Sequence, residues 1–456
     1  MSPGESPSAG MRLLRRVVAV EPSEVRALFW SCAYFFCVLS SYFILRPLRE
    51  EVGIARGVDK LPALFTGTWV GMAIANPIFS YFVSRYPRRK FLPWTYRFCA
   101  ANLLVFFALM RSLQPSATVF VGYAFYVWLS VFNLFAVSVF WGFMADIFRL
   151  EQSKRLFGFI GVGGSLGAIA GSWFTGATVK AIGGPQLLIV SVVLLELAVQ
   201  CVFRLIALGH AKETTPEVKP SPAEPAATVT SRRGTAFSGI GLVFRMPYLQ
   251  GIALYTIFYT LSATFLYFEQ QSIVLKSIEN PADRTVLFAH IDLWVNCLTL
   301  AMQMFATGRI VVWFGVMLTL MVQPLLTGIG FLTLGLQQTL TVVVAFQVLF
   351  RSVNQGTAKP ARETLYTVVD REIKYKSKSF IDTFIYRSGD NIAAWTFNGL
   401  TEGLKLSLAA IAFGTVPLAA VWLVTGLLLG RKQLELAHER ADAKAHLAGA
   451  TEASAS

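Results

Sequence analysis

The sequence has little charge. Only 14% of its 456 residues are Asp, Glu, Lys or Arg, whereas soluble globular proteins usually carry about 25% charged residues. Hydrophobic residues make up 55% of the chain, which excludes a disordered chain and a soluble enzyme. Acidic residues are the scarcer charged class, because 40 Lys and Arg stand against 26 Asp and Glu. A chain this apolar, and basic where it is polar, is predicted to be a polytopic membrane protein.

Cysteine and histidine are also scarce. The five cysteines lie inside apolar runs and form no CxxC pair, so they are expected to pack as small apolar residues rather than to build a disulfide scaffold. Two of the four histidines lie in the C-terminal tail, and no metal-ligand cluster or hydrolase triad is evident. We therefore expect no cofactor, no metal and no enzymatic activity.

Long apolar runs fill the rest of the chain, and a membrane-crossing helix needs roughly 20 such residues. They predict an N-terminal six-helix bundle at 27–207 and a C-terminal one at 248–430, between tails at 1–26 and 431–456. The segment 208–247, rich in Pro, Ala, Thr and charge, is predicted to be a linker. The twelve expected spans are 27–45, 61–83, 91–110, 116–145, 157–180, 186–207, 248–268, 285–306, 310–334, 339–355, 380–400 and 406–429.

The basic residues are distributed unevenly between alternate loops. With a cytoplasmic N-terminus, 27 Lys and Arg fall in the tails and cytoplasmic loops, and nine fall in the loops on the other side. Because basic residues are retained on the cytoplasmic side of membrane proteins, this bias predicts that both termini are cytoplasmic. The polar, Ala-rich tail from Arg431 is expected to form a short surface helix and then to be disordered.

The two halves of the chain are similar to each other. Span one ends SSYFILRPLREE (40–51) and span seven ends LSATFLYFEQQ (261–271). Spans five and eleven each follow a basic loop, SKRLFG (153–158) and YKSKSF (375–380). An internal repeat of this kind is typical of transporters. It predicts an all-α membrane protein of about twelve transmembrane helices in two pseudo-symmetric bundles, like the major facilitators.

Ionisable residues inside the spans are the candidates for function. A charge at mid-membrane costs about 2.5–3.5 kcal/mol on insertion scales, so such residues usually face a cavity or a partner. Charged residues inside spans therefore belong either to a transport pathway or to internal ion pairs that fix helix packing. Asp146 and Arg204 lie near span ends, so their side chains can also extend to the membrane surface. The set is Arg97, Asp146, Glu196, Arg204, Glu269, Asp292, Arg351, Asp382, Arg387 and Asp390.

Two arginines share a face of span one. Tyr42, Arg46 and Arg49 follow i, i+4 and i+7 spacing and therefore project from one side of the helix. Two neighbouring cations repel, so an anionic ligand or acidic residues such as Glu50 must offset them. The guanidinium fork suits phosphate or carboxylate groups, which favours an anionic substrate.

Helical spacing groups polar side chains on other spans as well. His290 and Asp292 are two residues apart and do not face each other, which excludes a relay between them. Arg387 and Asp390, at i and i+3, are expected to pair. Two further spans each carry a polar face. These faces consist of Tyr255, Tyr259, Ser262 and Glu269 in span seven, and of Gln347, Arg351 and Asn354 in span ten.

Span five is rich in glycine. No strand precedes the run and no Lys–Ser/Thr pair follows it, so it is not a nucleotide-binding loop. Gly163, Gly167 and Gly171 recur every fourth residue. Such a stripe predicts close packing against a neighbouring helix.

Three segments resemble the ATP/ADP translocase family of plastids and intracellular bacteria: YFILRPLREEVG (42–53), FWGFMADIFRLEQSKRLFGFIGVGGSLGAIAG (140–171) and KPARETLYTVVDREIKYKSKSFIDTFIYRSGD (359–390). The resemblance covers roughly residues 26–430. It implies a twelve-span, major-facilitator-like fold in a bacterial inner (plasma) membrane. It also implies exchange of nucleotides without hydrolysis.

The resemblance assigns charged residues to transport. Arg49 stands where the family typically has Lys, and Asp146 stands where it usually has Glu. The resemblance implies translocation roles for Arg46, Arg49, Asp146, Glu269, Arg362 and Glu363, with Lys359 nearby. The charged and aromatic faces described above add Tyr42, Tyr259 and Arg351 as substrate-contacting candidates, and Asp292, Asp382, Arg387 and Asp390 as coupling or gating candidates.

These observations predict an alternating-access antiporter of ATP/ADP-type nucleotides. A proton-coupled transporter of another organic anion is the second hypothesis, with Asp292, Glu269 and Asp390 as proton carriers. A non-transporting membrane partner or sensor is the third. The expected partners are a small anionic substrate and the lipid bilayer, without nucleic acid, and the chain is expected to be a monomer.

Overall fold

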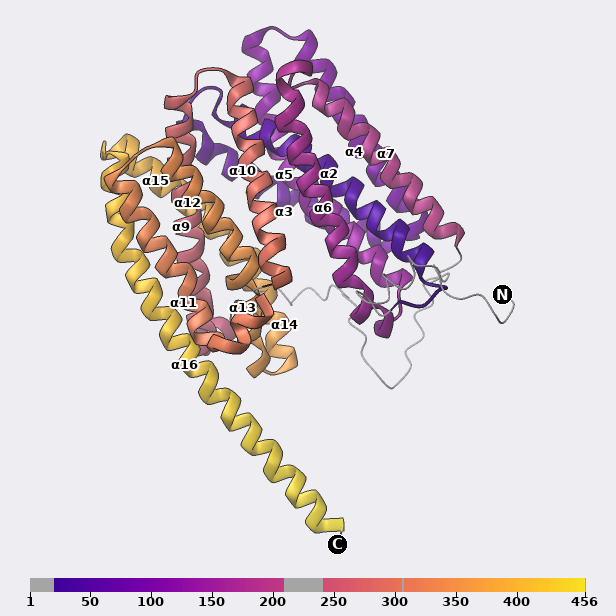
Figure 1. The fold of residues 1–456 in the computed structure, drawn as a ribbon, viewed down its shortest axis with the longest axis vertical. Helices are drawn as coiled ribbons and strands as arrows, with labels where there is room; N and C mark the ends of the chain where they lie inside the picture. Colours follow the sequence, from indigo (N-terminus) through magenta and orange to yellow (C-terminus); the bar gives the residue numbers. More distant parts are fainter. Residues whose placement is uncertain (1–19, 209–240, 306, 456) are drawn as a thin grey trace. The chain divides into compact units, whose positions relative to one another are not determined.

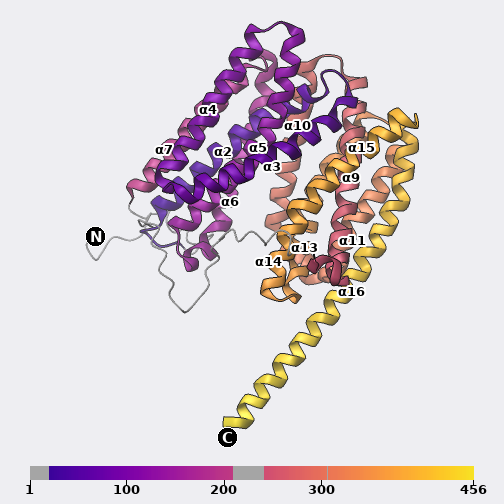
Figure 2. The same cartoon turned by 180° about the vertical axis from the view of Figure 1, so that it is seen from behind.

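The computed structural model describes residues 20–208, 241–305 and 307–455 (Figures 1 and 2). In these residues all regular structure is helical, which confirms the predicted all-α class. The α-helices are α2 (Val25–Ile54), α3 (Leu61–Arg85), α4 (Arg88–Ser112), α5 (Pro115–Ile147), α6 (Leu150–Ile182), α7 (Gln186–Ala207), α9 (Pro247–Ser277), α10 (Pro281–Phe305), α11 (Thr307–Leu336), α12 (Leu340–Val353), α13 (Lys359–Thr364), α14 (Arg371–Phe380), α15 (Tyr386–Asn398) and α16 (Leu408–Ala455).

Nine of the helices in the described ranges are long and apolar enough to cross a membrane, namely α2, α4 to α7, α9 to α11 and α16. The chain is therefore a multi-pass membrane protein. The other three expected spans are also helical: α3 covers the second, α12 the tenth, and the π-helical turn Ile381–Ile385 with α15 the eleventh. A π-helical turn lies at the end of the tenth expected span, at Asn354–Ala358, and two more lie at the ends of the eleventh, at Ile381–Ile385 and Gly399–Gly403. Such turns are frequent at functional sites.

The chain divides into two compact units. Of the described residues, the first contains 20–208 and 278–296, and the second contains 241–277, 297–305 and 307–455. The boundary passes through α10, so the first part of this helix belongs with the N-terminal helices although it follows α9 in the chain.

Helix α2 is central to the first unit and packs against α5, α6 and α7. Tyr34 and Phe35 of this helix are buried, and Phe35 stacks on Phe140 of α5 with ring centroids 4.1 Å apart. Tyr34 donates a hydrogen bond to the Tyr96 hydroxyl at 2.7 Å, and Tyr96 donates onward to the Ala136 carbonyl at 3.2 Å. The buried hydroxyl groups are thus paired, and α2 is held firmly in place.

The glycine stripe of α6 lies directly against the backbone of α2. A Cβ added at Gly163, Gly167 or Gly171 would lie 2.4–2.8 Å from a carbonyl oxygen of α2. Ser40 of α2 also donates a hydrogen bond to the Gly167 carbonyl at 2.9 Å. The predicted packing role of the stripe is confirmed.

We expect Gly167→Ala to destabilise the protein by about 1–3 kcal/mol, the usual cost of overpacking. The new methyl group would meet the Phe36 carbonyl oxygen at 2.4 Å, and backbone cannot rotate out of the way as a side chain can. Gly161→Ala is the matched control, because a Cβ there meets nothing within 4 Å. The measurement is the thermal midpoint in detergent, and equal midpoints for the two variants would contradict the expectation.

Helix α9 is central to the second unit and packs against α12, α15 and α16. Trp422 of α16 is fully buried and meets Tyr255 of α9 edge-on, with ring centroids 5.3 Å apart. Helix α16 runs without a break from Leu408 to Ala455. The tail is therefore a continuation of the last span rather than a separate short helix followed by disorder, because its Ala-rich sequence favours helix.

Candidate functional site

Glu50 lies between the two arginines of α2. Its Oε1 atom is 3.0 Å from Nη2 of Arg49 and 3.9 Å from Nε of Arg46. All three side chains are largely buried, with exposed fractions of 7–21%. The expectation that acidic residues offset the two neighbouring cations is confirmed, and Glu50 is one of them.

Helix α5 provides the surroundings of Arg49. Ser130 accepts a hydrogen bond from Nη1 at 3.2 Å, and the Tyr126 hydroxyl accepts one from Nη2 at 3.5 Å. The guanidinium carbon lies 4.4 Å from the centre of the Tyr126 ring, a favourable cation–π geometry. Neither partner is evident from the sequence, because both lie more than 70 residues from Arg49 in the chain.

Asp292 is the counter-ion of Arg46. Its Oδ1 atom lies 2.9 Å from Nη1 of Arg46, and its side chain is only 3% exposed. Asp292 belongs to the part of α10 that groups with the first unit. The structure thus joins a predicted coupling residue to a predicted substrate-binding residue. Tyr42, one turn before Arg46, is buried beside them.

Two further ion pairs tie the first part of α10 to α2 and α6. Arg284 donates to Oε1 of Glu51 at 2.9 Å, with both side chains under 10% exposed, and it also donates to the carbonyl groups of Ile278 and Glu279 at 3.2 Å. Lys180 and Asp283 form a more exposed pair at 2.5 Å. Sequence analysis counted Lys180 and Arg284 only as loop cations, since nothing local reveals a partner more than 100 residues away.

In the second unit, Tyr259 links two predicted faces. Asn354 donates a hydrogen bond to the Tyr259 hydroxyl at 2.9 Å. The Tyr259 ring stacks on Phe350 at 5.8 Å, and the guanidinium carbon of Arg362 also lies 5.8 Å from its centre. Arg351, on the same helix as Phe350, is half-buried. The polar faces predicted for spans seven and ten therefore meet through Tyr259 and Asn354.

The third motif lies next to this cluster. Arg362 is only 8% exposed, whereas Lys359 is exposed. Glu363 forms an ion pair with Lys378 of α14. Within α14, the hydrogen bond and charge of Lys376 hold the pKa of the Glu372 carboxyl below its usual range. The motif thus contributes one buried cation, Arg362, and two partly exposed ion pairs, Glu363–Lys378 and Glu372–Lys376.

The carboxyl groups of the second unit have different surroundings. Glu269 is fully buried, and neither of its oxygens has a hydrogen-bond partner in the described ranges. Asp390 accepts a hydrogen bond from Thr264 of α9 at 3.5 Å. The charge of Arg387 acts on Asp390, as their spacing predicts, but the two side chains form no direct ion pair in the described residues, and Arg387 lies over the Tyr386 ring. Asp382 is exposed in a π-helical turn.

Asp146 lies apart from the arginines of α2. It is exposed in the last turn of α5, 16 residues beyond Ser130, which contacts Arg49. At 1.5 Å per residue the separation along the helix is about 24 Å. If Asp146 contacts the substrate, it must do so at a different point along the transport pathway from Arg46 and Arg49.

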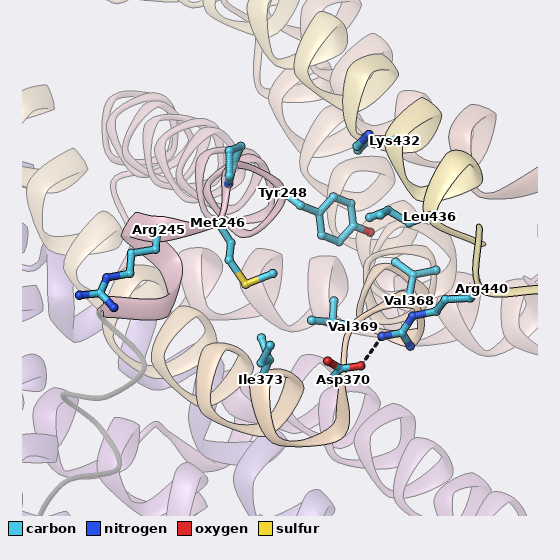
Figure 3. Close-up of a pocket in the computed structure, with 11 residues that line it drawn as sticks. Arg245, Met246, Tyr248, Val368, Val369, Asp370, Ile373, Lys432, Leu436 and Arg440 are labelled. Atoms are coloured by element: carbon cyan, nitrogen blue, oxygen red, sulfur yellow. Dashed lines mark hydrogen bonds and ion pairs between the residues drawn. The ribbon is translucent and has the colours of Figure 1, made fainter. Parts of the chain in front are cut away.

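A separate cavity of about 320 Å³ lies where the start of α9, the start of α14 and the extension of α16 come together (Figure 3). Arg440 points across its rim to Asp370, with 2.6 Å between Nη2 and Oδ1. None of the predicted site residues lines it. Within the described ranges, no cluster of three His, Cys, Asp or Glu side chains is placed to hold a metal ion.

Comparison with known proteins decides the family. The model of the Major Facilitator Superfamily matches residues 27–368, well over half of the chain. The chain belongs to this superfamily. It is therefore a membrane transporter of the major facilitator type, which takes a small-molecule substrate.

The curated relatives of this major facilitator protein are ADP,ATP carrier proteins. It is 23% identical to ADP,ATP carrier protein 1 of Chlamydia trachomatis, and the match covers 87% of each chain. It is 22% identical to the chloroplastic ADP,ATP carrier protein 2 of Arabidopsis thaliana, over 94% of this chain and 78% of the relative. The resemblance inferred from the three motifs is confirmed.

Solved transporter structures share the fold. The POT family transporter PepTSo matches with a TM-score of 0.61 and 13% identity, over 90% of this chain and 98% of its own. A bacterial homologue of the human lysosomal transporter Spinster matches with a TM-score of 0.53 and 12% identity, over 91% of this chain and 99% of its own. At these identities the likeness concerns the fold alone.

Proposed function

We propose that this protein exchanges ATP/ADP-type nucleotides across a bacterial inner membrane by alternating access, with both termini in the cytoplasm. The observation that carries the proposal is the placement of Arg46 and Arg49 side by side within a membrane-spanning helix. Two guanidinium groups can each form paired hydrogen bonds to phosphate oxygens, and in a largely buried site they suit a polyphosphate. The names of the curated relatives support the same substrate class.

The ion pairs of Arg46 suggest how substrate binding and conformational change are linked. Arg46 is held by Asp292 on α10 and is close to Glu50 on its own helix. A phosphate that binds Arg46 competes with the Asp292 carboxylate. Binding therefore releases one of the contacts that hold the first part of α10 against α2, and the exchange of ion pairs is a known way to switch between states.

Tyr259 and Arg362 are the proposed second recognition element. The arginine is buried, and an aromatic ring with a nearby cation can contact a nucleobase or a phosphate. Tyr255 is less suited to this role, because it is fully buried and its hydroxyl already donates to the Leu320 carbonyl at 2.8 Å. Glu363, Asp382 and Arg387 are proposed as gating residues, since they lie in or beside the segment broken by π-helical turns.

Counter-exchange in reconstituted vesicles tests the function. Vesicles loaded with ATP, ADP, phosphate or no solute are placed in labelled ADP. We expect uptake only into vesicles that contain ATP or ADP, because an antiporter cannot return without a substrate. Protein-free vesicles are the control, and uptake that is independent of the internal solute would contradict nucleotide exchange.

A proton-coupled transporter of another organic anion is the second candidate, and Glu269 favours it. This buried carboxyl group has no hydrogen-bond partner in the described part of the chain, so it can gain or lose a proton without breaking an ion pair. The two functions differ in one measurement. Dissipating the proton gradient would stop proton-coupled uptake and would leave nucleotide exchange unchanged.

A further inference from the structure

One ion pair of the first unit lies on the outside of its helices. Arg97 of α4 and Glu196 of α7 form two hydrogen bonds, from Nε to Oε2 at 3.1 Å and from Nη2 to Oε1 at 2.8 Å. Gln200 donates a third bond to Oε1 at 2.8 Å. Yet the Arg97 and Glu196 side chains are 53% and 44% exposed. The pair is well formed and about half exposed, with Phe203 of α7 beside the guanidinium group.

The pair lies deep within the membrane-crossing part of both helices. Arg97 is six residues inside the apolar span 91–110, and Glu196 is 11 residues from the end of α7 at Ala207. At 1.5 Å per residue these offsets are about 9 and 16 Å, well inside a hydrocarbon core about 30 Å thick. Lipid headgroups do not reach this depth. Charged residues here nearly always face protein or a water-filled cavity.

We propose that this face of α4 and α7 binds the same face of a second copy of the chain. In the dimer, Arg97 of each copy also meets Glu196 of the partner subunit, so the four charges form one closed network. The proposal replaces the monomer expected from the sequence, and it is independent of the transported substrate.

Symmetry makes the surface self-complementary. Two copies inserted with the same orientation are related by a two-fold axis along the membrane normal, which keeps every residue at its depth. Arg97 and Glu196 pair within one chain and so share one depth. The axis therefore brings two cations and two anions into a single layer, where each arginine faces a carboxylate.

The surrounding surface permits a close approach. Ala101 lies one turn beyond Arg97 on the exposed side of α4 and allows two helices to come near each other. Trp94 and Phe98 are 77% and 68% exposed on the same side. A small residue flanked by large apolar ones, around a polar centre, is the composition of a helix interface in a membrane.

Exchanging charges between chains tests the proposal. Two differently tagged copies are produced together, and the fraction that co-purifies is measured. Wild-type copies are expected to co-purify. Arg97→Glu copies alone and Glu196→Arg copies alone should do so at least ten-fold less, because their interfaces hold four like charges. A mixture of Arg97→Glu with Glu196→Arg copies should recover, since opposite charges then meet only between chains.

A cross-link in native membranes keeps the test independent of detergent and of the stability of the charge variants. With the five native cysteines replaced by alanine, Ala101→Cys is expected to give an oxidised dimer. Val424→Cys, on an exposed face of α16, is the matched control and should give none. An Ala101→Cys yield no higher than that of the control, or no recovery in the mixture of charge variants, would overturn the dimer and leave an intrachain pair.

Discussion

Replacing Arg49 by alanine is expected to reduce labelled nucleotide exchange about 100-fold, with the amount of protein in the membrane unchanged. Arg49 offers its guanidinium group from a buried position between Glu50, Ser130 and Tyr126. Losing a charge-assisted contact to a phosphate in such a setting costs about 3 kcal/mol, and each 1.4 kcal/mol is a factor of ten. The measurement is the initial rate of counter-exchange in vesicles.

Arg26→Ala is the matched control for this experiment. Arg26 lies near the start of the same helix and is exposed, so its loss should leave exchange at the wild-type rate. Arg49→Lys keeps the charge but loses the fork and is expected to retain part of the activity. Unimpaired exchange by Arg49→Ala would remove Arg49 from the mechanism, whatever the substrate.

Replacing Glu51 by alanine is expected to cost about 3–5 kcal/mol of stability, the usual loss when one partner of a buried ion pair is removed. The variant leaves Arg284, with a side chain only 8% exposed, without its carboxylate. The first part of α10 would then lose a main attachment to α2. The thermal midpoint in detergent measures this loss, and the exchange rate shows whether the attachment also matters for transport.

Two comparisons isolate the contribution of burial. Asp283→Asn breaks the exposed pair with Lys180 in the same part of α10 and is expected to cost less than about 1 kcal/mol. The double variant Glu51→Leu with Arg284→Met removes both buried charges and should be less destabilised than Glu51→Ala alone. If Glu51→Ala and Asp283→Asn lose the same amount of stability, the buried ion pair stabilises the protein no more than the exposed one.

Sequence reasoning succeeded where the signal is local. The shared face of Arg46 and Arg49 and the glycine stripe of α6 both follow from helical spacing within one span, and the structure places both as predicted. The long apolar runs likewise yield the helical fold, because lipid allows few other backbone arrangements.

Contacts between distant segments could not be predicted in the same way. Asp292 is an evident candidate for function, but its pairing with Arg46 depends on how α10 packs against α2. Spacing alone suggested that Arg387 pairs with Asp390, whereas packing against α9 provides Thr264 as the partner of Asp390. A single sequence holds no record of these tertiary choices.

The contact between α2 and α6 restricts how the chain can vary in length. Because carbonyl oxygens of α2 lie against three glycines of α6, the register of α2 is fixed to a single residue along 32–40. One residue inserted between Ser40 and Arg46 would turn Arg46 and Arg49 by about 100° around the helix axis, away from Asp292 and Ser130. A relative with a gap in this interval therefore cannot place its arginines as this chain does, whatever its overall identity.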